Sequence, residues 1–271
     1  MPSTWITSQR MSTSFFLDKV AIVTGASTGI GRATACALAK EGACVALAAR
    51  RENHLLELAR EIGAMGREAL VLPTDVTEPD QVKAMTQQVL AKWGRVDILI
   101  SNAGEYIRGP IIDLDPADLQ RSLDVNYFGG VHCIKAVLPA MLAQKRGHIL
   151  AVTSMDGKIG LPSDAPYVSA KFALTGFLEV LRQEVREHGI TVTNVLPGRV
   201  DTVMVDRLKF SWVSPKIAPE AVARAALNGI RRGKPIVIVP PQAKLLYYIN
   251  VFAPSLSDRL SRFFRLEGWT D

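Results

Sequence analysis

The chain has 271 residues, and 48% of them are hydrophobic, which excludes a disordered protein and is enough for one large domain or two small ones. The formal net charge is +6 and the isoelectric point is near 9.3, which permits attraction to anions such as nucleotides or acidic lipids. The basic residues form no run interleaved with aromatics, so we expect no nucleic-acid partner.

The sequence contains neither a long apolar segment nor clustered metal ligands. Its apolar runs are short and broken by charge, so no transmembrane helix is expected, and residues 1–17 lack the continuous apolar core of a signal peptide. We interpret residues 1–17 as a flexible N-terminal extension. Cys36, Cys44 and Cys133 lie in apolar segments without ligand-like spacing, which predicts free thiols in a reducing compartment and no metal site. We therefore expect a cytoplasmic protein.

Short apolar runs alternate with helical patterns along the chain. Strands are expected at residues 19–24, 44–49, 69–72, 96–100, 148–153, 190–196 and 236–239. Helices are expected between them, including a long one over residues 116–144 with a joint near Gly129 and Gly130. Continuous apolar strands that alternate with helices are typical of a parallel sheet covered on both faces. The sequence therefore predicts an α/β fold for residues 18–240: a single doubly wound parallel sheet of the Rossmann type, with about seven strands.

A glycine-rich loop joins the first strand to the first helix. In Gly25-x-x-x-Gly29-x-Gly31 the glycines let the backbone approach a pyrophosphate at the helix N-terminus, where free N–H groups favour an anion. A glycine cluster can also be simple turn chemistry, but its place between a strand and a helix favours nucleotide binding. The predicted cofactor-binding residues here are Gly25, Ser27, Thr28, Gly29, Ile30 and Gly31.

The end of the second strand predicts which cofactor is bound. In dinucleotide-binding folds an acidic residue there binds the ribose hydroxyl, whereas an arginine accommodates a 2′-phosphate. Here the strand ends in Arg50 and Arg51, and no acid occurs before Glu52. We therefore predict that Arg50 and Arg51 bind NADP(H); the alternative is two solvated arginines at a helix start.

Tyr167 and Lys171 stand four residues apart, just after Pro166, which fits a helix start. On a helix the two side chains share one face, and a cation beside a phenol favours the phenolate, which predicts a lowered pKa for Tyr167. Taken alone, such a pair is more often accidental.

Four motifs together resemble the classical short-chain dehydrogenase/reductase family over residues 18–240. They are the glycine loop, Asn102-Ala103-Gly104, a serine thirteen residues before Tyr167, and Tyr167-x-x-x-Lys171. The family usually has asparagine where this chain has Ser101. The resemblance implies a catalytic tetrad of Asn126, Ser154, Tyr167 and Lys171.

The resemblance also implies a role for each tetrad residue. Tyr167 is expected to act as the general acid/base while hydride moves between the nicotinamide and a carbonyl or alcohol carbon, and Ser154 to hold the reacting oxygen. Lys171 is expected to bind the nicotinamide ribose. Asn126 is expected to hold a water that links Lys171 to solvent; alternatively it is a helix-kink residue bonded only to backbone. The cofactor contacts implied elsewhere are Asp75, Val76, Asn102, Ala103, Gly104, Tyr167, Lys171, Pro197, Gly198, Val200 and Thr202.

The rival hypothesis is a catalytically silent NADP(H)-binding sensor or scaffold. Such a protein does not need all four tetrad residues, so their joint presence favours an enzyme. The loops 105–108, 155–156, 161–164 and 203–216 are expected to set specificity, although they do not identify the substrate. Asp156 and Asp164 either reach the substrate or cap turns. From the family we expect a homodimer or homotetramer.

Residues 241–271 form a C-terminal amphipathic extension. Apolar residues recur there at helical spacing beside Arg259, Arg262 and Arg265. The extension packs on its own domain, on a partner subunit, or weakly on a membrane surface, and we expect protein packing ahead of membrane contact.

Overall fold

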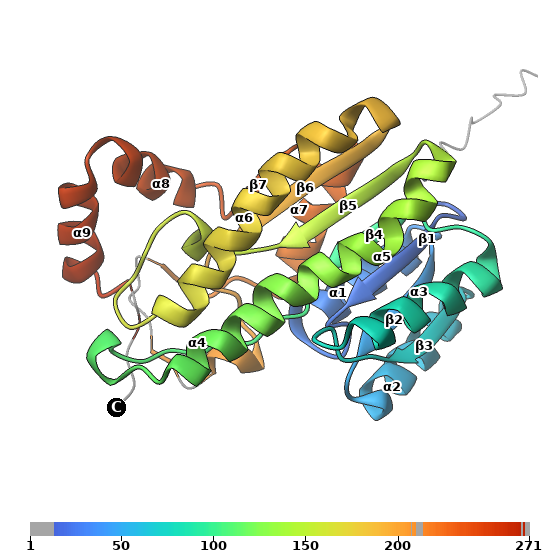
Figure 1. The fold of residues 1–271 in the computed structure, drawn as a ribbon, viewed down its shortest axis with the longest axis horizontal. Helices are drawn as coiled ribbons and strands as arrows, with labels where there is room; N and C mark the ends of the chain where they lie inside the picture. The colour runs from blue at the N-terminus through green and yellow to red at the C-terminus, as the bar shows by residue number, and fades with distance from the viewer. Residues whose placement is uncertain (1–13, 207, 210–213, 267, 269–271) are drawn as a thin grey trace, which may run out of the picture.

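The computed structural model describes residues 14–206, 208–209, 214–266 and 268 (Figure 1). Within these residues seven strands form one parallel sheet in the order β3-β2-β1-β4-β5-β6-β7. The strands are β1 (Val20–Thr24), β2 (Cys44–Ala49), β3 (Ala69–Pro73), β4 (Ile98–Ser101), β5 (Gly147–Val152), β6 (Ile190–Pro197) and β7 (Ile236–Val239). This confirms the predicted doubly wound fold. The strand order reverses between β1 and β4, which places a ligand crevice at the carboxyl ends of these strands.

Helices cover both faces of the sheet (Figure 1). One layer consists of α1 (Gly29–Lys40), α2 (Glu52–Ala64) and α7 (Pro219–Arg231). The other consists of α3 (Pro79–Trp93), α5 (Gly129–Gln144) and α6 (Ala165–Val185), while α4 (Pro116–Leu123) packs on α6. Short 3₁₀ turns span Ile111–Asp113, Met155–Gly157, Arg186–His188 and Val203–Val205.

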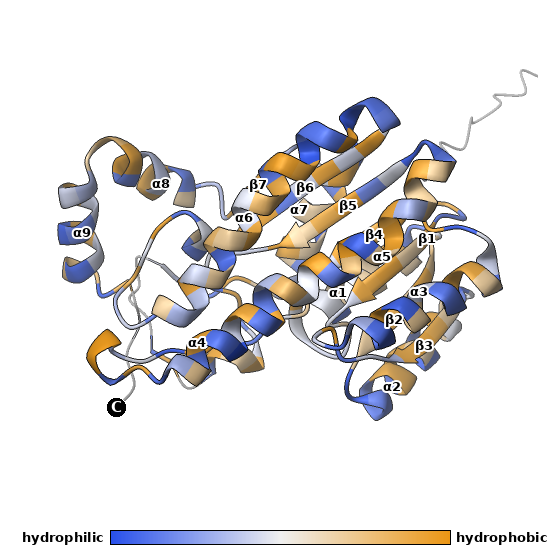
Figure 2. Cartoon of the chain, viewed as in Figure 1, coloured by the Kyte–Doolittle hydropathy of each residue, from blue (hydrophilic) through white to orange (hydrophobic). Residues whose placement is uncertain are grey.

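The two layers explain why the strands are continuously apolar. In β1 the side chains of Ala21 and Val23 join the core under α1, α2 and α7, whereas Val20 and Ile22 join the core under α3, α5 and α6. Every second residue therefore faces a different helix layer, and neither face of the strand meets water. Figure 2 shows the same pattern as largely orange strands under helices that carry blue outer faces.

The joint in the long helical stretch lies slightly earlier than predicted. A π-helical segment, Asp124–Phe128, separates α4 from α5, and it contains Asn126. The side chain of Asn126 donates to the backbone oxygen of Ser122, one turn earlier, and lies 3.2 Å from the Ser122 hydroxyl, so it competes with the regular helix pattern. Gly129 instead serves close packing, because a Cβ there would lie 2.6 Å from Cγ2 of Val76.

The C-terminal extension forms a helical hairpin of α8 (Ala243–Phe252) and α9 (Pro254–Phe263), which projects from one end of the sheet (Figure 1). Leu246 and Tyr247 pack on Met155, Ile159 and Leu196 of the main domain, so the extension meets its own domain. Among the described residues no helix is long and apolar enough to span a bilayer.

Residues 1–13 of the predicted N-terminal extension lie outside the described part of the chain. Residues 14–17 pack on the domain: the ring of Phe16 is fully buried, and the hydroxyl of Ser14 donates to Glu41 Oε2 at 2.6 Å.

Candidate active site

A cavity of about 1090 Å³ opens at the carboxyl ends of the strands. Its lining includes nearly every site residue predicted from the sequence, the exceptions being Gly31 and Asn126. The predicted residues that it brings together are Gly25, Ser27, Thr28, Gly29, Ile30, Arg50, Arg51, Asp75, Val76, Asn102, Ala103, Gly104, Ser154, Tyr167, Lys171, Pro197, Gly198, Val200 and Thr202. The volume exceeds that of an ordinary ligand pocket, which leaves room for a cofactor beside a substrate.

The end of the cavity near β1 has the form of a dinucleotide cradle. Helix α1 begins at Gly29, so its free N–H groups face the cavity, and no acidic residue occupies its first turn. Gly31 packs beneath the loop: a Cβ there would lie 2.2 Å from the backbone oxygen of Gly25. Asn102 Nδ2 donates to the backbone oxygen of Thr24 at 3.0 Å and so fixes the loop after β4 against this turn. The residues present therefore fit a pyrophosphate.

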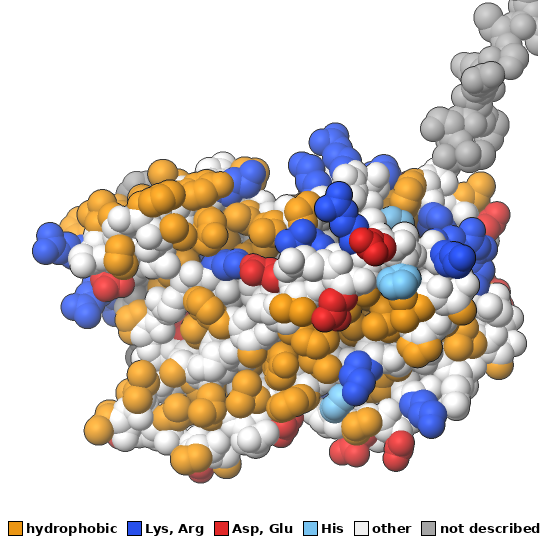
Figure 3. Space-filling model, turned by 45° about the horizontal axis from the view of Figure 1, so that its top comes forward, with side chains coloured by type: hydrophobic (Ala, Val, Ile, Leu, Met, Phe, Trp, Pro, Cys, Tyr) orange, Lys and Arg blue, Asp and Glu red, His pale blue; other side chains and the backbone are white. Residues whose placement is uncertain are grey.

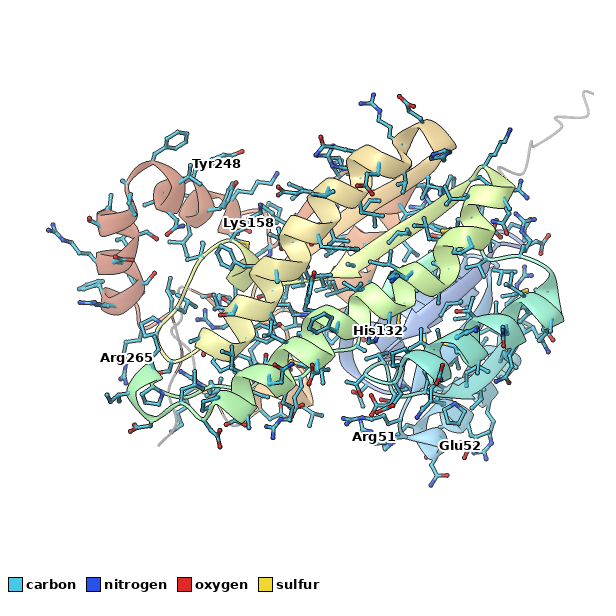
Figure 4. All side chains as sticks on the ribbon, in the orientation of Figure 1. Arg51, Glu52, His132, Lys158, Tyr248 and Arg265 are labelled. Carbon is cyan, nitrogen blue, oxygen red and sulfur yellow. The ribbon has the colours of Figure 1, made fainter. Side chains whose placement is uncertain are left out.

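The adenosine side of the cradle carries two arginines and one carboxylate. Arg51 Nη2 donates to Ser27 Oγ at 3.3 Å and lies within 3.5 Å of Thr28 Oγ1, which brings its guanidinium over the glycine loop. Figure 4 shows Arg51 at the start of α2, next to Glu52. Asp75 Oδ1 accepts from the backbone N–H of Thr77 at 3.0 Å, which orients the Asp75 carboxylate at the rim of the cavity.

Three of the four tetrad residues meet below this cradle. Tyr167 and Lys171 lie one turn apart on α6, and both are buried, with Lys171 Nζ 5.4 Å from the centroid of the Tyr167 ring. Lys171 Nζ donates to the backbone oxygen of Val152 at 3.3 Å, at the end of β5. Ser154 follows β5 and lines the same cavity. A hydroxyl, a phenol and an amine therefore converge on one point of the cavity.

Burial sets the pKa values of this group, and it corrects one expectation. The pKa of Tyr167 is raised, chiefly by burial and then by the negative charge of Asp156, rather than lowered by Lys171 as predicted. Burial likewise lowers the pKa of Lys171 to about 8, against the opposing effect of Asp156. Desolvation penalises the charged form of each residue and is the largest cause of both shifts.

Two carboxylates lie beside Ser154 and Tyr167. Ser154 Oγ donates to Asp156 Oδ2 at 3.1 Å, so Asp156 holds the serine hydroxyl; burial raises the pKa of the Asp156 carboxyl. The phenol of Tyr106 donates to Asp164 Oδ1 at 2.7 Å, and the Tyr106 ring packs edge-on to Tyr167 with centroids 5.0 Å apart. Both carboxylates line the cavity, so they can reach a substrate as well as their local partners.

Asn126 lies behind the cavity rather than in its wall. Its Nδ2 donates to the backbone oxygens of Glu105 at 2.8 Å and Ser122 at 3.1 Å, and its Oδ1 accepts from the Glu105 N–H at 3.1 Å. Gly104 separates it from Lys171, because a Cβ at Gly104 would lie 2.8 Å from Asn126 Oδ1 and 3.6 Å from Lys171 Nζ. Asn126 thus joins the π-helical segment to the loop after β4. Its Nδ2 also lies 3.2 Å from Ser122 Oγ, so its partners are not backbone alone, as the kink alternative supposes.

Comparison with known proteins identifies the family. The family described as short chain dehydrogenase matches residues 19–210. The chain belongs to the short-chain dehydrogenase/reductase family. Dehydrogenase/reductase SDR family member 7B of Bos taurus is 33% identical over 264 residues, covering 91% of this chain and 81% of that protein. The predicted family is therefore confirmed.

Two solved structures of dehydrogenases share the fold. A short chain dehydrogenase/reductase from Burkholderia phymatum in complex with NAD superposes with a TM-score of 0.82 and 25% identity, covering 89% of this chain and 95% of that one. An alcohol dehydrogenase from Thermococcus sibiricus complexed with 5-hydroxy-NADP gives a TM-score of 0.75 and 27% identity, covering 82% and 95%.

The far end of the cavity in this short-chain dehydrogenase/reductase is apolar. It is lined by side chains of the C-terminal hairpin and of the 3₁₀ turn at Val203–Val205. This turn lies in the loop 203–216, which the sequence predicts to set specificity; Phe210, Trp212 and Val213 of that loop lie outside the described part of the chain. Reasoning from sequence did not assign the lining residues Arg199, Leu246, Ile249, Leu260, Phe264 and Leu266. The apolar spacing of residues 243–266 was the available signal for the hairpin residues.

Proposed function

We propose that the chain is an NADP(H)-dependent oxidoreductase that interconverts a carbonyl compound and the corresponding alcohol. The observation that carries this proposal is the convergence of Ser154, Tyr167 and Lys171 on a cavity that also contains the glycine loop. A sensor that only binds the nucleotide has no use for a hydroxyl, a phenol and an amine at the same point.

Tyr167 is the proton donor of the proposed reduction. When bound, the nicotinamide supplies or accepts the hydride. The raised pKa of Tyr167 keeps its phenol protonated at neutral pH, which is the form needed to protonate a carbonyl oxygen. Ser154 donates to Asp156 in the free protein and would transfer that hydrogen bond to the reacting oxygen. Lys171 would bind the ribose, and Asn126 would keep the loop after β4 in place beside it.

The preference for NADP(H) rests on the end of β2. Arg50 and Arg51 both line the cavity there, and the guanidinium of Arg51 contacts the hydroxyls of Ser27 and Thr28. A guanidinium binds phosphate through paired, charge-assisted hydrogen bonds, whereas a carboxylate would repel it. The two related structures contain different cofactors, NAD in one and an NADP derivative in the other, so the family alone does not decide.

The expected homodimer or homotetramer has support in the surface of the helix layer. Phe128, Phe172 and Val180 are exposed on the π-helical segment and α6. Apolar side chains at such positions suit an isologous contact between two copies. Light scattering of the full chain tests this, and a monomer at micromolar concentration would contradict it.

A screen of NADPH oxidation over a panel of carbonyl compounds tests the proposed activity. The panel should include apolar ketones and aldehydes, because the substrate end of the cavity is apolar. Tyr167→Phe should lower kcat at least about a hundredfold, with little change in the Kd of NADPH. Equal turnover by Tyr167→Phe would contradict the assigned role of Tyr167.

If the chain binds NADPH tightly but reduces no carbonyl compound, the hypothesis of an NADP(H)-binding sensor replaces the hypothesis of an enzyme.

A further inference from the structure

The C-terminal hairpin has two apolar faces, and the domain uses only one of them. The inner face, with Leu246, Leu260 and Phe264, lines the cavity. The outer face carries Tyr248, Val251 and Phe252 on α8 and Leu256 and Phe263 on α9, all of them exposed. Phe252 and Phe263 are 81% and 79% exposed. If the helices only covered the cavity, large aromatic side chains would not be needed on their outer side.

The outer face is continuous on the molecular surface. Tyr248, Val251 and Phe252 recur at helical spacing on α8, and Leu256 and Phe263 on α9. Figure 3 shows orange side chains gathered over the hairpin at the upper left, with blue side chains at its edge, and Figure 4 shows Tyr248 pointing away from the molecule. A contiguous apolar surface rimmed by charge is typical of an interaction site.

The charge around this face favours an anionic partner. Lys244, Arg259 and Arg262 are exposed on the same two helices, whereas Asp258 is the single acidic residue between positions 243 and 266. A two-fold contact with a second copy would place this basic surface against the same surface of the other copy, with Asp258 alone to pair with the cations, which is unfavourable. Aromatic and aliphatic side chains flanked by Lys and Arg are instead the composition of helices that lie on anionic lipid.

The length and position of the hairpin suit a bilayer surface. Each helix has ten residues, or about 15 Å, which is half the thickness of the hydrocarbon layer, so the helices can lie on a bilayer but not cross it. Leu245 is 68% exposed and also lines the cavity, so the outer face leads directly to the cavity mouth.

We propose that the outer face of the α8–α9 hairpin docks on the surface of an anionic lipid bilayer. Tyr248, Phe252 and Phe263 insert at the level of the headgroups, and Lys244, Arg259 and Arg262 contact the lipid phosphates and carboxylates. Docking brings the mouth of the cavity, at Leu245, to the membrane. The proposal concerns a surface and does not depend on the reaction.

Co-sedimentation of the full chain with vesicles tests it. Vesicles of phosphatidylcholine with phosphatidylserine should bind the protein, phosphatidylcholine alone should bind it weakly, and high salt should release it. Phe252→Ser with Phe263→Ser should weaken binding about tenfold, because two apolar side chains are lost from the interface. Arg259→Glu with Arg262→Glu should abolish the preference for phosphatidylserine.

The matched control is Leu56→Ser with Met65→Ser, because these partly exposed residues lie at α2, away from the hairpin, and should leave binding unchanged. Circular dichroism and NADPH binding of each variant establish that it is folded. Unchanged vesicle binding by the Phe252 and Phe263 variant would overturn the proposal. So would a wild-type chain that ignores vesicles and forms an oligomer that this variant disrupts, since the face would then belong to a second copy.

Discussion

The nucleotide end of the cavity is built from backbone and glycine, whereas its far end is built from the side chains of α8 and α9. At the nucleotide end a single added carbon on Gly31 or Gly104 would collide with backbone or with a tetrad side chain. At the far end Leu246, Ile249 and Phe264 are only half-buried, and their helices pack on the domain through one small apolar cluster.

The two ends should therefore differ in how they respond to substitution. The nucleotide end binds a ligand through fixed N–H groups, so small displacements of its backbone remove whole hydrogen bonds. The far end binds by apolar contact, which is roughly proportional to area and tolerates change. The variants below separate binding of the nucleotide from binding of the substrate.

Gly31→Ala should have the largest effect. Its new Cβ would meet the backbone oxygen of Gly25 at 2.2 Å, so the glycine loop must shift away from the pyrophosphate site. We expect the Kd of NADPH, measured by fluorescence titration, to rise at least about tenfold, because that is the effect of losing one charge-assisted hydrogen bond. Gly63→Ala on α2 is the control, because a Cβ there meets nothing within 4 Å and alanine favours a helix. Equal nucleotide affinity in the two variants would refute the close packing argued here.

Arg50→Asp should change the preference between cofactors. It places a carboxylate where it would repel a 2′-phosphate and accept a hydrogen bond from a ribose hydroxyl. The ratio of kcat/KM for NADPH to that for NADH should fall by about tenfold or more. Arg60→Asp, at an exposed position of α2 that does not line the cavity, should leave the ratio unchanged. A wild-type enzyme that prefers NADH would contradict the assignment of Arg50 and Arg51.

Leu246→Ala should act on the far end only. It removes apolar contact with a substrate while leaving the glycine loop untouched, so KM for an apolar carbonyl compound should rise several-fold, on the order of the 1–2 kcal/mol of lost contact. The Kd of NADPH should stay within experimental error. Val251→Ala is the control on the same helix, since Val251 is exposed and does not line the cavity. A parallel loss of nucleotide affinity in Leu246→Ala would mean that the two ends are not separable.

Asp164→Asn should give the smallest effect, on the pH dependence of stability. Burial raises the pKa of Asp164 to about 7, so the folded chain keeps a proton that the unfolded chain loses near pH 4. Below about pH 4 this proton makes its full contribution to the free energy of unfolding. The contribution is lost as the pH rises to about 7, and the free energy of unfolding falls by at most about 1.4 kcal/mol per pH unit.

Asparagine has no such titration and can still accept from Tyr106, so urea unfolding of the variant should depend less on pH across this window. The exposed Asp113→Asn should unfold like the wild type. Identical pH dependence in Asp164→Asn and the wild type would contradict the raised pKa.

The sequence was most informative where chemistry requires a fixed residue type. Strand positions, the glycine loop and Tyr167-x-x-x-Lys171 could be predicted because buried strands, tight turns and helical spacing each leave a local pattern. The exact place of the joint at Asn126 could not, because Asn126 bonds the distant loop at Glu105 as well as Ser122 one turn earlier. Residues that meet only in the folded chain leave no local signal.

The direction of the Tyr167 pKa shift was wrong for the same reason. Spacing places Lys171 near Tyr167, but the balance between attraction and desolvation depends on how deeply the pair is buried and on Asp156. Likewise, apolar spacing predicted an amphipathic helical extension after residue 240 without saying which face meets the cavity, since α8 is apolar on both sides.

Transfer of deuterium from NADPH that is deuterated at both C4 positions to the carbinol carbon of the product, followed by NMR, tests the central claim most directly. With a carbonyl compound found in the screen, the wild-type chain should place deuterium on the reduced carbon. Tyr167→Phe should bind NADPH with similar affinity and transfer at least about a hundredfold more slowly. Deuterium transfer at the wild-type rate in Tyr167→Phe, or reduction without any deuterium in the product, would contradict the account.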